Sequence, residues 1–184
     1  MKNVDDLTCV QRAKNGDIQA FAAIVSDYKE MVFTIVMKMV QNREDAEDIT
    51  QEVFIKVFRS LEKFKEEAEF STWLYRIAYN ATLSELRKKK LFFTSFEDDL
   101  ISENKLFTDD KEVDEKEIKL QYLEVALKKL SPDEIFLVTL HYLDDKSIEE
   151  ISKISNLSIS NVKVKLHRIR KKLSLEISKL MQDE

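Results

Sequence analysis

Residues 70–87 combine side chains that proteins use to hold single-stranded nucleic acid. The residues in question are spaced three or four apart, which places them on one helix face. They are Trp73, Arg76, Asn80, Ser84 and Arg87. An aromatic ring can stack on a base, guanidinium groups bind phosphates, and amides and hydroxyls bond base edges. Taken alone, the pattern is equally consistent with aromatic rings that complete a core. The opposite face repeats Leu74, Ile77, Ala78 and Ala81, so we expect an amphipathic helix packed on a core.

The composition of the chain favours an all-α fold. Among 184 residues there is one Gly and one Pro, with 43% apolar and 35% charged residues, which leaves almost none of the turn chemistry that hairpins require. The lone Cys9 cannot form an internal disulfide, and with only His141 and His167 no Cys/His cluster is spaced to hold zinc. The sequence therefore predicts no metal and no cofactor, and fits a reducing cytoplasm.

Membrane insertion and secretion are not expected from the sequence. The most apolar run, residues 31–40, is far shorter than the roughly 20 residues that span a bilayer, and no signal-peptide pattern opens the chain. The net charge of −5 argues against a nucleic-acid partner only if the charges are evenly distributed.

Three helices are predicted before residue 62. The first ends at Gly16, the second runs from the N-cap Asp17 to about Gln41, and the third starts after the N-cap Asn42. On the third helix an acidic, hydrogen-bonding patch comprises Asp45, Asp48, Gln51 and Glu52. It suits a basic helical partner, although spacing alone favours an ordinary solvated face.

The connection over residues 63–69 carries Phe64 and leads into Phe70. Such a loop can host a flipped base, or it can tuck both phenyl rings into the core, which is the commoner fate of phenylalanine. After residues 88–90, all lysine, periodicity fails. Residues 97–115 contain nine acids and two lysines, and residues 94–115 are predicted to be an extended, flexible acidic linker.

The second half is predicted to be a helical bundle that ends in a helix-turn-helix. Helical period resumes at Glu117, with Leu120, Leu123, Leu127 and Leu130 expected in the core, followed by a helix with Ile135, Val138, Leu140 and Leu143 inward. Capping boxes start at Ser131 and Ser147. Asn156 suits a left-handed turn, and Ser158 caps a last helix with Val162, Leu166, Ile169 and Leu173 inward.

The last helix is strongly basic on its outward side. Residues 158–179 hold seven positive residues against the single acid Glu176. The acidic overall charge therefore conceals a basic surface suited to reading DNA.

With these pieces placed, the chain resembles the extracytoplasmic-function group of bacterial sigma factors, small two-domain members of the sigma-seventy superfamily. The resemblance rests on residues 13–17 (AKNGD) followed by Ala20-Phe21, on residues 42–58 (NREDAEDITQEVFIKVF), on residues 70–80 (FSTWLYRIAYN), and on residues 130–173 with LSPDE and the helix-turn-helix. Four motifs in this order are jointly specific.

The resemblance implies two domains, residues 1–93 and 116–184, joined by the linker 94–115. The first would bind the clamp helices of core RNA polymerase through Asp45, Asp48, Gln51 and Glu52. It would also recognise and help melt the minus-ten promoter element, for which the candidate residues are Phe64, Phe70, Ser71, Thr72, Trp73, Arg76, Asn80 and Arg87. The second would meet the polymerase flap and read the minus-thirty-five element with Ser158, Ser160, Asn161, Lys163, Lys165 and Arg168.

The resemblance also implies a non-catalytic, cytoplasmic protein with promoter DNA and core polymerase as partners and an anti-sigma factor as regulator. The sequence departs from the common family pattern at Asn156, Ser160-Asn161 and Val164-Lys165, near the groups that face base edges. The alternative is a plain helix-turn-helix regulator whose N-terminal domain senses a ligand or dimerises. Such a regulator would need neither the acidic patch nor the aromatic-basic helix. An enzyme has little support, since no phosphate loop, activated nucleophile or metal cluster appears in the sequence.

Overall fold

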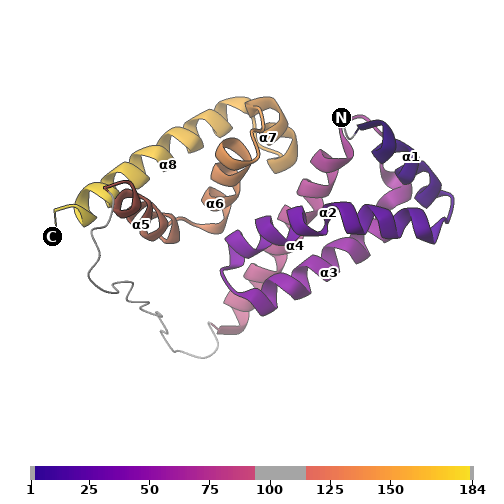
Figure 1. The fold of residues 1–184 in the computed structure, drawn as a ribbon, viewed down its shortest axis with the longest axis horizontal. Helices are drawn as coiled ribbons and strands as arrows, with labels where there is room; N and C mark the ends of the chain where they lie inside the picture. Colours follow the sequence, from indigo (N-terminus) through magenta and orange to yellow (C-terminus); the bar gives the residue numbers. More distant parts are fainter. Residues whose placement is uncertain (1–2, 94–114, 183–184) are drawn as a thin grey trace.

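The structure, a computed structural model, describes residues 3–93 and 115–182, which form helices and turns without a strand (Figure 1). The helices of the first half are α1 (Asn3–Lys14), α2 (Ile18–Val40), α3 (Arg43–Ser60), the 3₁₀ turn η1 (Leu61–Lys63) and α4 (Phe70–Phe93). Those of the second half are α5 (Glu115–Lys128), α6 (Pro132–Val138), the π-helical turn η2 (Thr139–Leu143), α7 (Ile148–Ser155) and α8 (Ile159–Leu180). The predicted all-α fold with two helical bundles is confirmed.

The first bundle packs α1 to α4 around side chains that the periodicity had predicted. Ala46, Ile49, Val53, Val57 and Leu61 are all buried along α3 and η1. Asp17 accepts a hydrogen bond from the backbone N–H of Ala20, and Asn42 accepts one from that of Asp45. Between the first two helices Gly16 has φ +87°, a left-handed conformation that glycine adopts without steric cost.

In the second bundle the predicted caps are present in full. Ser131 and Ser147 each accept from the backbone N–H three residues on, while Glu134 and Glu150 accept from the N–H of the capping serine. Asn156 takes the left-handed conformation with φ 58°, and Ser158 caps α8. Helices α7 and α8 therefore form the helix-turn-helix that the sequence predicted (Figure 1).

Two of the predicted core positions in this bundle are wrong. Leu120 is 60% exposed and Leu143 is 59% exposed, whereas the buried side chains are Tyr122 and Ala126 on α5 and Leu130 just after its end. The stripe on α5 is thus offset from the run of leucines. Leu143 ends the π-helical η2, and the wider turn rotates it away from the face that an α-helical period predicts.

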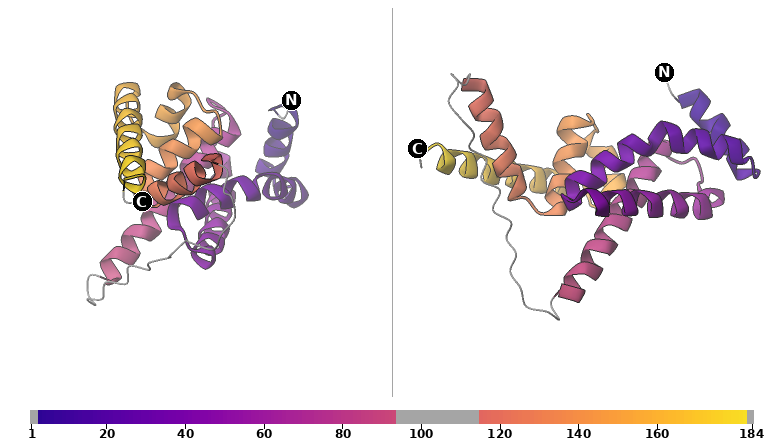
Figure 2. Two further views of the ribbon diagram at one scale, coloured as in Figure 1. Left: turned by 60° about the vertical axis from the view of Figure 1, so that its left-hand side comes forward. Right: turned by 60° about the horizontal axis from the view of Figure 1, so that its bottom comes forward.

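The two bundles meet along a continuous seam, defined here by Glu69, Tyr75, Tyr79, Asp133, Phe136, Asp144 and Lys146. Helix α6 packs against α2, and α7 packs against α4 (Figure 2). Buried side chains of both bundles belong to one hydrophobic cluster. The predicted linker lies outside the described residues except for Glu115, which starts α5, so the boundaries given above for the two domains stay a prediction.

Within the described residues, no helix combines the length and the apolar character needed to cross a membrane.

Candidate nucleic-acid interface

A pocket of about 480 Å³ lies beside the start of α4 and is called the α4 pocket. Its walls are the loop 63–68, the α4 residues Thr72, Trp73 and Arg76, and, from the helix-turn-helix, Lys153 of α7 and the turn residue Asn156. Each of the three walls contributes a cationic side chain: Lys63 and Lys65 from the loop, Arg76 from α4 and Lys153 from α7. The pocket thus joins an indole ring to a basic rim, which is the chemistry that a base and its flanking phosphates require.

Three aromatic rings pack together at this pocket, and two of them, Phe64 and Trp73, line it. Phe64 and Trp73 have ring centroids 5.2 Å apart, Phe70 and Trp73 5.7 Å apart, and Phe64 and Phe70 5.5 Å apart. Phe64 is 3% exposed and Phe70 is 4% exposed, while Trp73 is half-buried. The second interpretation of the loop, in which both phenyl rings enter the core, describes this conformation.

The predicted minus-ten residues therefore divide by exposure. Arg76, Asn80 and Arg87 are exposed, Ser71 and Trp73 are half-buried, and Phe64, Phe70 and Thr72 are buried. Direct DNA contacts by all eight remain a prediction. Of the buried members, Phe64 and Thr72 line the α4 pocket, and Phe70 packs against Trp73.

Two tyrosines on the other side of α4 were missed by the sequence analysis as functional residues. The Tyr75 hydroxyl donates to Asp144 Oδ2 at 2.9 Å, and the Tyr79 hydroxyl donates to Asp133 Oδ1 at 2.9 Å. The Tyr79 ring also stacks on Phe136 with 4.2 Å between centroids. Because burial and the neighbouring carboxylates raise the pKa of Tyr75 and of Tyr79 well above the ordinary value, both hydroxyls stay protonated donors.

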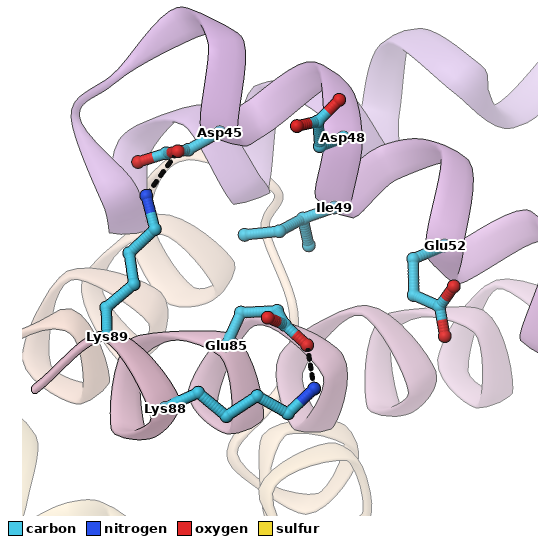
Figure 3. Close-up of a pocket in the computed structure, with 7 residues that line it drawn as sticks. All are labelled: Asp45, Asp48, Ile49, Glu52, Glu85, Lys88 and Lys89. Atoms are coloured by element: carbon cyan, nitrogen blue, oxygen red, sulfur yellow. Dashed lines mark hydrogen bonds and ion pairs between the residues drawn. The ribbon is translucent and has the colours of Figure 1, made fainter. Parts of the chain in front are cut away.

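The acidic residues predicted on α3 line a second hollow of about 370 Å³, called the acidic groove (Figure 3). Asp45, Asp48 and Glu52 form one side with Ile49, and Glu85, Lys88 and Lys89 of α4 form the other. Lys89 pairs with Asp45, and Lys88 pairs with Glu85 at 2.6 Å. Asp48 and the nearby Gln51 are exposed, so carboxylate and amide groups remain presented to a partner.

The recognition residues predicted on α8 lie at its start and along one face. Ser158, Ser160, Asn161, Lys163 and Arg168 are exposed, and Lys165 is half-buried. Val162, Leu166 and Ile169 are buried between them and hold the helix on its bundle. The exposed face therefore carries hydroxyl, amide and cationic groups on a rigid helix, as major-groove readers do.

These features define a helical DNA-binding protein with a second polar surface outside its helix-turn-helix. Comparison with protein families gives two matches: Sigma-70 region 2 over residues 24–92, and Sigma-70 region 4 over residues 120–173. The first spans α2 to α4 and the second spans the helix-turn-helix bundle.

Full-length relatives extend the match over nearly the whole chain. The ECF RNA polymerase sigma factor SigW of Bacillus subtilis is 32% identical over 179 residues, 93% of this chain and 96% of the relative. The ECF RNA polymerase sigma-E factor of Haemophilus influenzae is 30% identical over 190 residues, 98% of this chain and 99% of the relative. The chain therefore belongs to the ECF RNA polymerase sigma factors, which act as transcription initiation factors.

Solved structures share the fold. CnrH, in complex with the cytosolic domain of CnrY, matches with a TM-score of 0.68 at 20% identity, covering 98% of this chain and 99% of CnrH. The sigma factor RpoE, in complex with the anti-sigma factor NepR from Bartonella quintana, matches with a TM-score of 0.66 at 18% identity, covering 86% of this chain and 96% of RpoE.

Proposed function

We propose that this sigma factor binds core RNA polymerase and the minus-ten element through residues 1–93 and reads the minus-thirty-five element through residues 116–184. The observation that carries the proposal is the α4 pocket, which combines an indole ring with a basic rim. The same chain also carries a basic helix-turn-helix. On this proposal the protein acts in the cytoplasm and performs no catalysis of its own.

Opening of the minus-ten element is assigned to the α4 pocket. Removing a base from the stack costs a few kcal/mol, and stacking on an aromatic ring returns about 1–3 kcal/mol per base. Trp73 supplies the stacking surface, Phe64 and Phe70 hold its ring from beneath, and Arg76 binds phosphate. Asn80 and Arg87 extend the polar face along α4.

Attachment to polymerase is assigned to the acidic groove together with Gln51. Its exposed Asp48 and half-buried Asp45 and Glu52 suit the cationic surface of a partner helix, here the clamp helices of polymerase. The Lys89–Asp45 pair lies at one end of the groove, where an incoming cationic side chain would compete with Lys89. The second bundle meets the polymerase flap.

The arrangement in which the seam joins the two bundles, called the closed arrangement, cannot bind the two promoter elements at the same time. Elements centred near minus-ten and minus-thirty-five lie roughly 25 base pairs apart, or about 85 Å at about 3.4 Å per pair. In this structure Lys153 and Asn156, from the first helix and the turn of the helix-turn-helix, line the α4 pocket itself. We therefore expect α6 and α7 to separate from α2 and α4 when promoter DNA binds.

The closed arrangement is suited to sequestration by an anti-sigma factor. Two of the solved relatives are complexes, CnrH with the cytosolic domain of CnrY and RpoE with the anti-sigma factor NepR. A regulator that binds both bundles in the closed arrangement would keep α7 at the α4 pocket and so block DNA.

Sequencing the transcripts made by core polymerase with and without the purified chain tests the proposed function. We expect new start sites that share one minus-ten and one minus-thirty-five sequence, because each bundle contributes an independent DNA contact. A transcript set unchanged across a genomic library would overturn the proposal.

A further inference from the structure

Helix α1 contacts the loop that walls the α4 pocket, although it lies before the segment matched by Sigma-70 region 2, which starts at residue 24. The contact is made mainly by Lys14. Its ammonium donates to the backbone carbonyl of Phe64 at 2.6 Å and to Glu66 Oε1 at 3.1 Å. It also lies 5.4 Å from the centroid of the Phe64 ring.

These bonds hold a backbone that is costly to form. Glu66 has φ 61°, in the left-handed region that residues other than glycine adopt only when their surroundings enforce it. Gln11, one turn before Lys14, also donates to the Glu66 carboxylate. Two residues of α1 thus fix one carboxylate and, through it, the strained turn of the loop.

Lys14 is not an ordinary surface lysine. Its side chain is 17% exposed, and its ammonium is held by both a carbonyl and a carboxylate. The Phe64 ring that it covers is in turn 5.2 Å from Trp73. A chain of direct contacts therefore runs from α1 through Phe64 to the ring proposed to stack on a base.

We propose that Lys14 is a positioning residue for capture of the unstacked minus-ten base, acting through the Phe64 carbonyl and the Glu66 turn. This inference rests on the proposed function of the α4 pocket. Lys14 touches no DNA itself. It keeps the loop in the shape that accepts the base, and it neutralises Glu66, a carboxylate on the pocket wall that would otherwise repel phosphate.

The test uses holoenzyme assembled from core polymerase and the full chain. The probe is a fork DNA from a promoter found by the transcript sequencing, with a duplex minus-thirty-five element and a single-stranded minus-ten strand. The reference is the same DNA without the single strand. We expect Lys14→Met to weaken fork binding about tenfold while binding of the reference duplex stays unchanged. Lys14→Arg should restore most of the loss, since a guanidinium can still donate to both oxygens.

A second variant separates positioning from charge. In Lys14→Met/Glu66→Gln the net charge of the pair is restored but the bond to the Phe64 carbonyl is still missing. If Lys14 positions the loop, the double variant stays close to Lys14→Met, and the loss persists when salt is raised to 0.5 M, where exposed charges are screened. Full recovery in the double variant or at high salt would overturn the proposal.

Further controls make the remaining outcomes decisive. Lys29→Met, at an exposed lysine of α2, should bind the fork like the natural chain. Fork binding by Lys14→Met that equals that of the natural chain, or an equal loss on fork and reference duplex, would overturn the inference. If Arg76→Ala also leaves fork binding unchanged, the proposed function of the pocket fails; if only Lys14→Met does so, the inference alone fails.

Discussion

At the scale of single residues, Trp73 and Arg76 separate support of the fold from capture of DNA. The Trp73 ring is half-buried and contacts both Phe64 and Phe70, whereas Arg76 is exposed on the rim of the α4 pocket. We therefore expect Trp73→Ala to lower the free energy of unfolding by about 2 kcal/mol, roughly half the cost of a fully buried aromatic, and to impair promoter opening. Arg76→Ala should impair opening alone.

Urea unfolding and permanganate reactivity of minus-ten thymines measure the two effects. The matched control for Arg76→Ala is Arg59→Ala, an exposed arginine in the last turn of α3 outside the pocket walls. Normal opening by Trp73→Ala together with reduced stability would assign the indole to the core, which is the interpretation that the sequence left open.

At the scale of elements, helix ends were predictable because their signals are local. In each capping box, at Ser131 and at Ser147, the serine and its glutamate lie within four residues of each other, and both boxes form as expected. Leu143 was predicted wrongly because a π-turn changes the helical phase without a sequence signal. Partners in the α4 pocket and the acidic groove were also beyond prediction, since Lys89 and Asp45 are 44 residues apart.

The capping box of α6 gives an acid-dependent prediction for its element. Burial raises the pKa of Glu134, but hydrogen bonds from Lys172 and from Ser131 outweigh it and hold this pKa below 4.5. A lowered folded pKa stabilises the protein above the unfolded value, and this stabilisation is lost as the pH falls through the folded value. Glu134→Gln should thus cost about 0.5–1 kcal/mol at pH 7, a solvent-screened amount, and less at pH 3.

Urea unfolding at pH 7 and pH 3 checks this expectation. Glu124→Gln, at an exposed glutamate of α5, is the control and should change neither measurement. A cost for Glu134→Gln that is the same at both pH values would show that the carboxylate charge does not stabilise the box.

At the scale of the whole molecule, the seam joins the two bundles in the closed arrangement that the structure shows. Its hydrogen bonds join Tyr75 to Asp144, which are 69 positions apart in the sequence, and Tyr79 to Asp133, which are 54 positions apart. Lys146 adds a contact to Glu69 at 3.9 Å. No local sequence pattern indicates such pairs. The sequence therefore predicted two bundles but not the contacts between them. We propose above that promoter binding separates the bundles, and on that proposal every seam contact opposes DNA binding by favouring the closed state.

Substitution of both seam tyrosines should therefore shift the chain toward the open state. Tyr75→Phe/Tyr79→Leu removes two hydroxyl donors and the ring that stacks on Phe136. A loss of about 2 kcal/mol from the closed state raises the open fraction up to about 30-fold. We expect a larger radius of gyration by small-angle scattering and more open promoter at limiting chain concentration. Tyr142→Phe, at an exposed tyrosine, should change neither. An unchanged scattering profile with unchanged promoter occupancy would mean that the seam does not restrain opening.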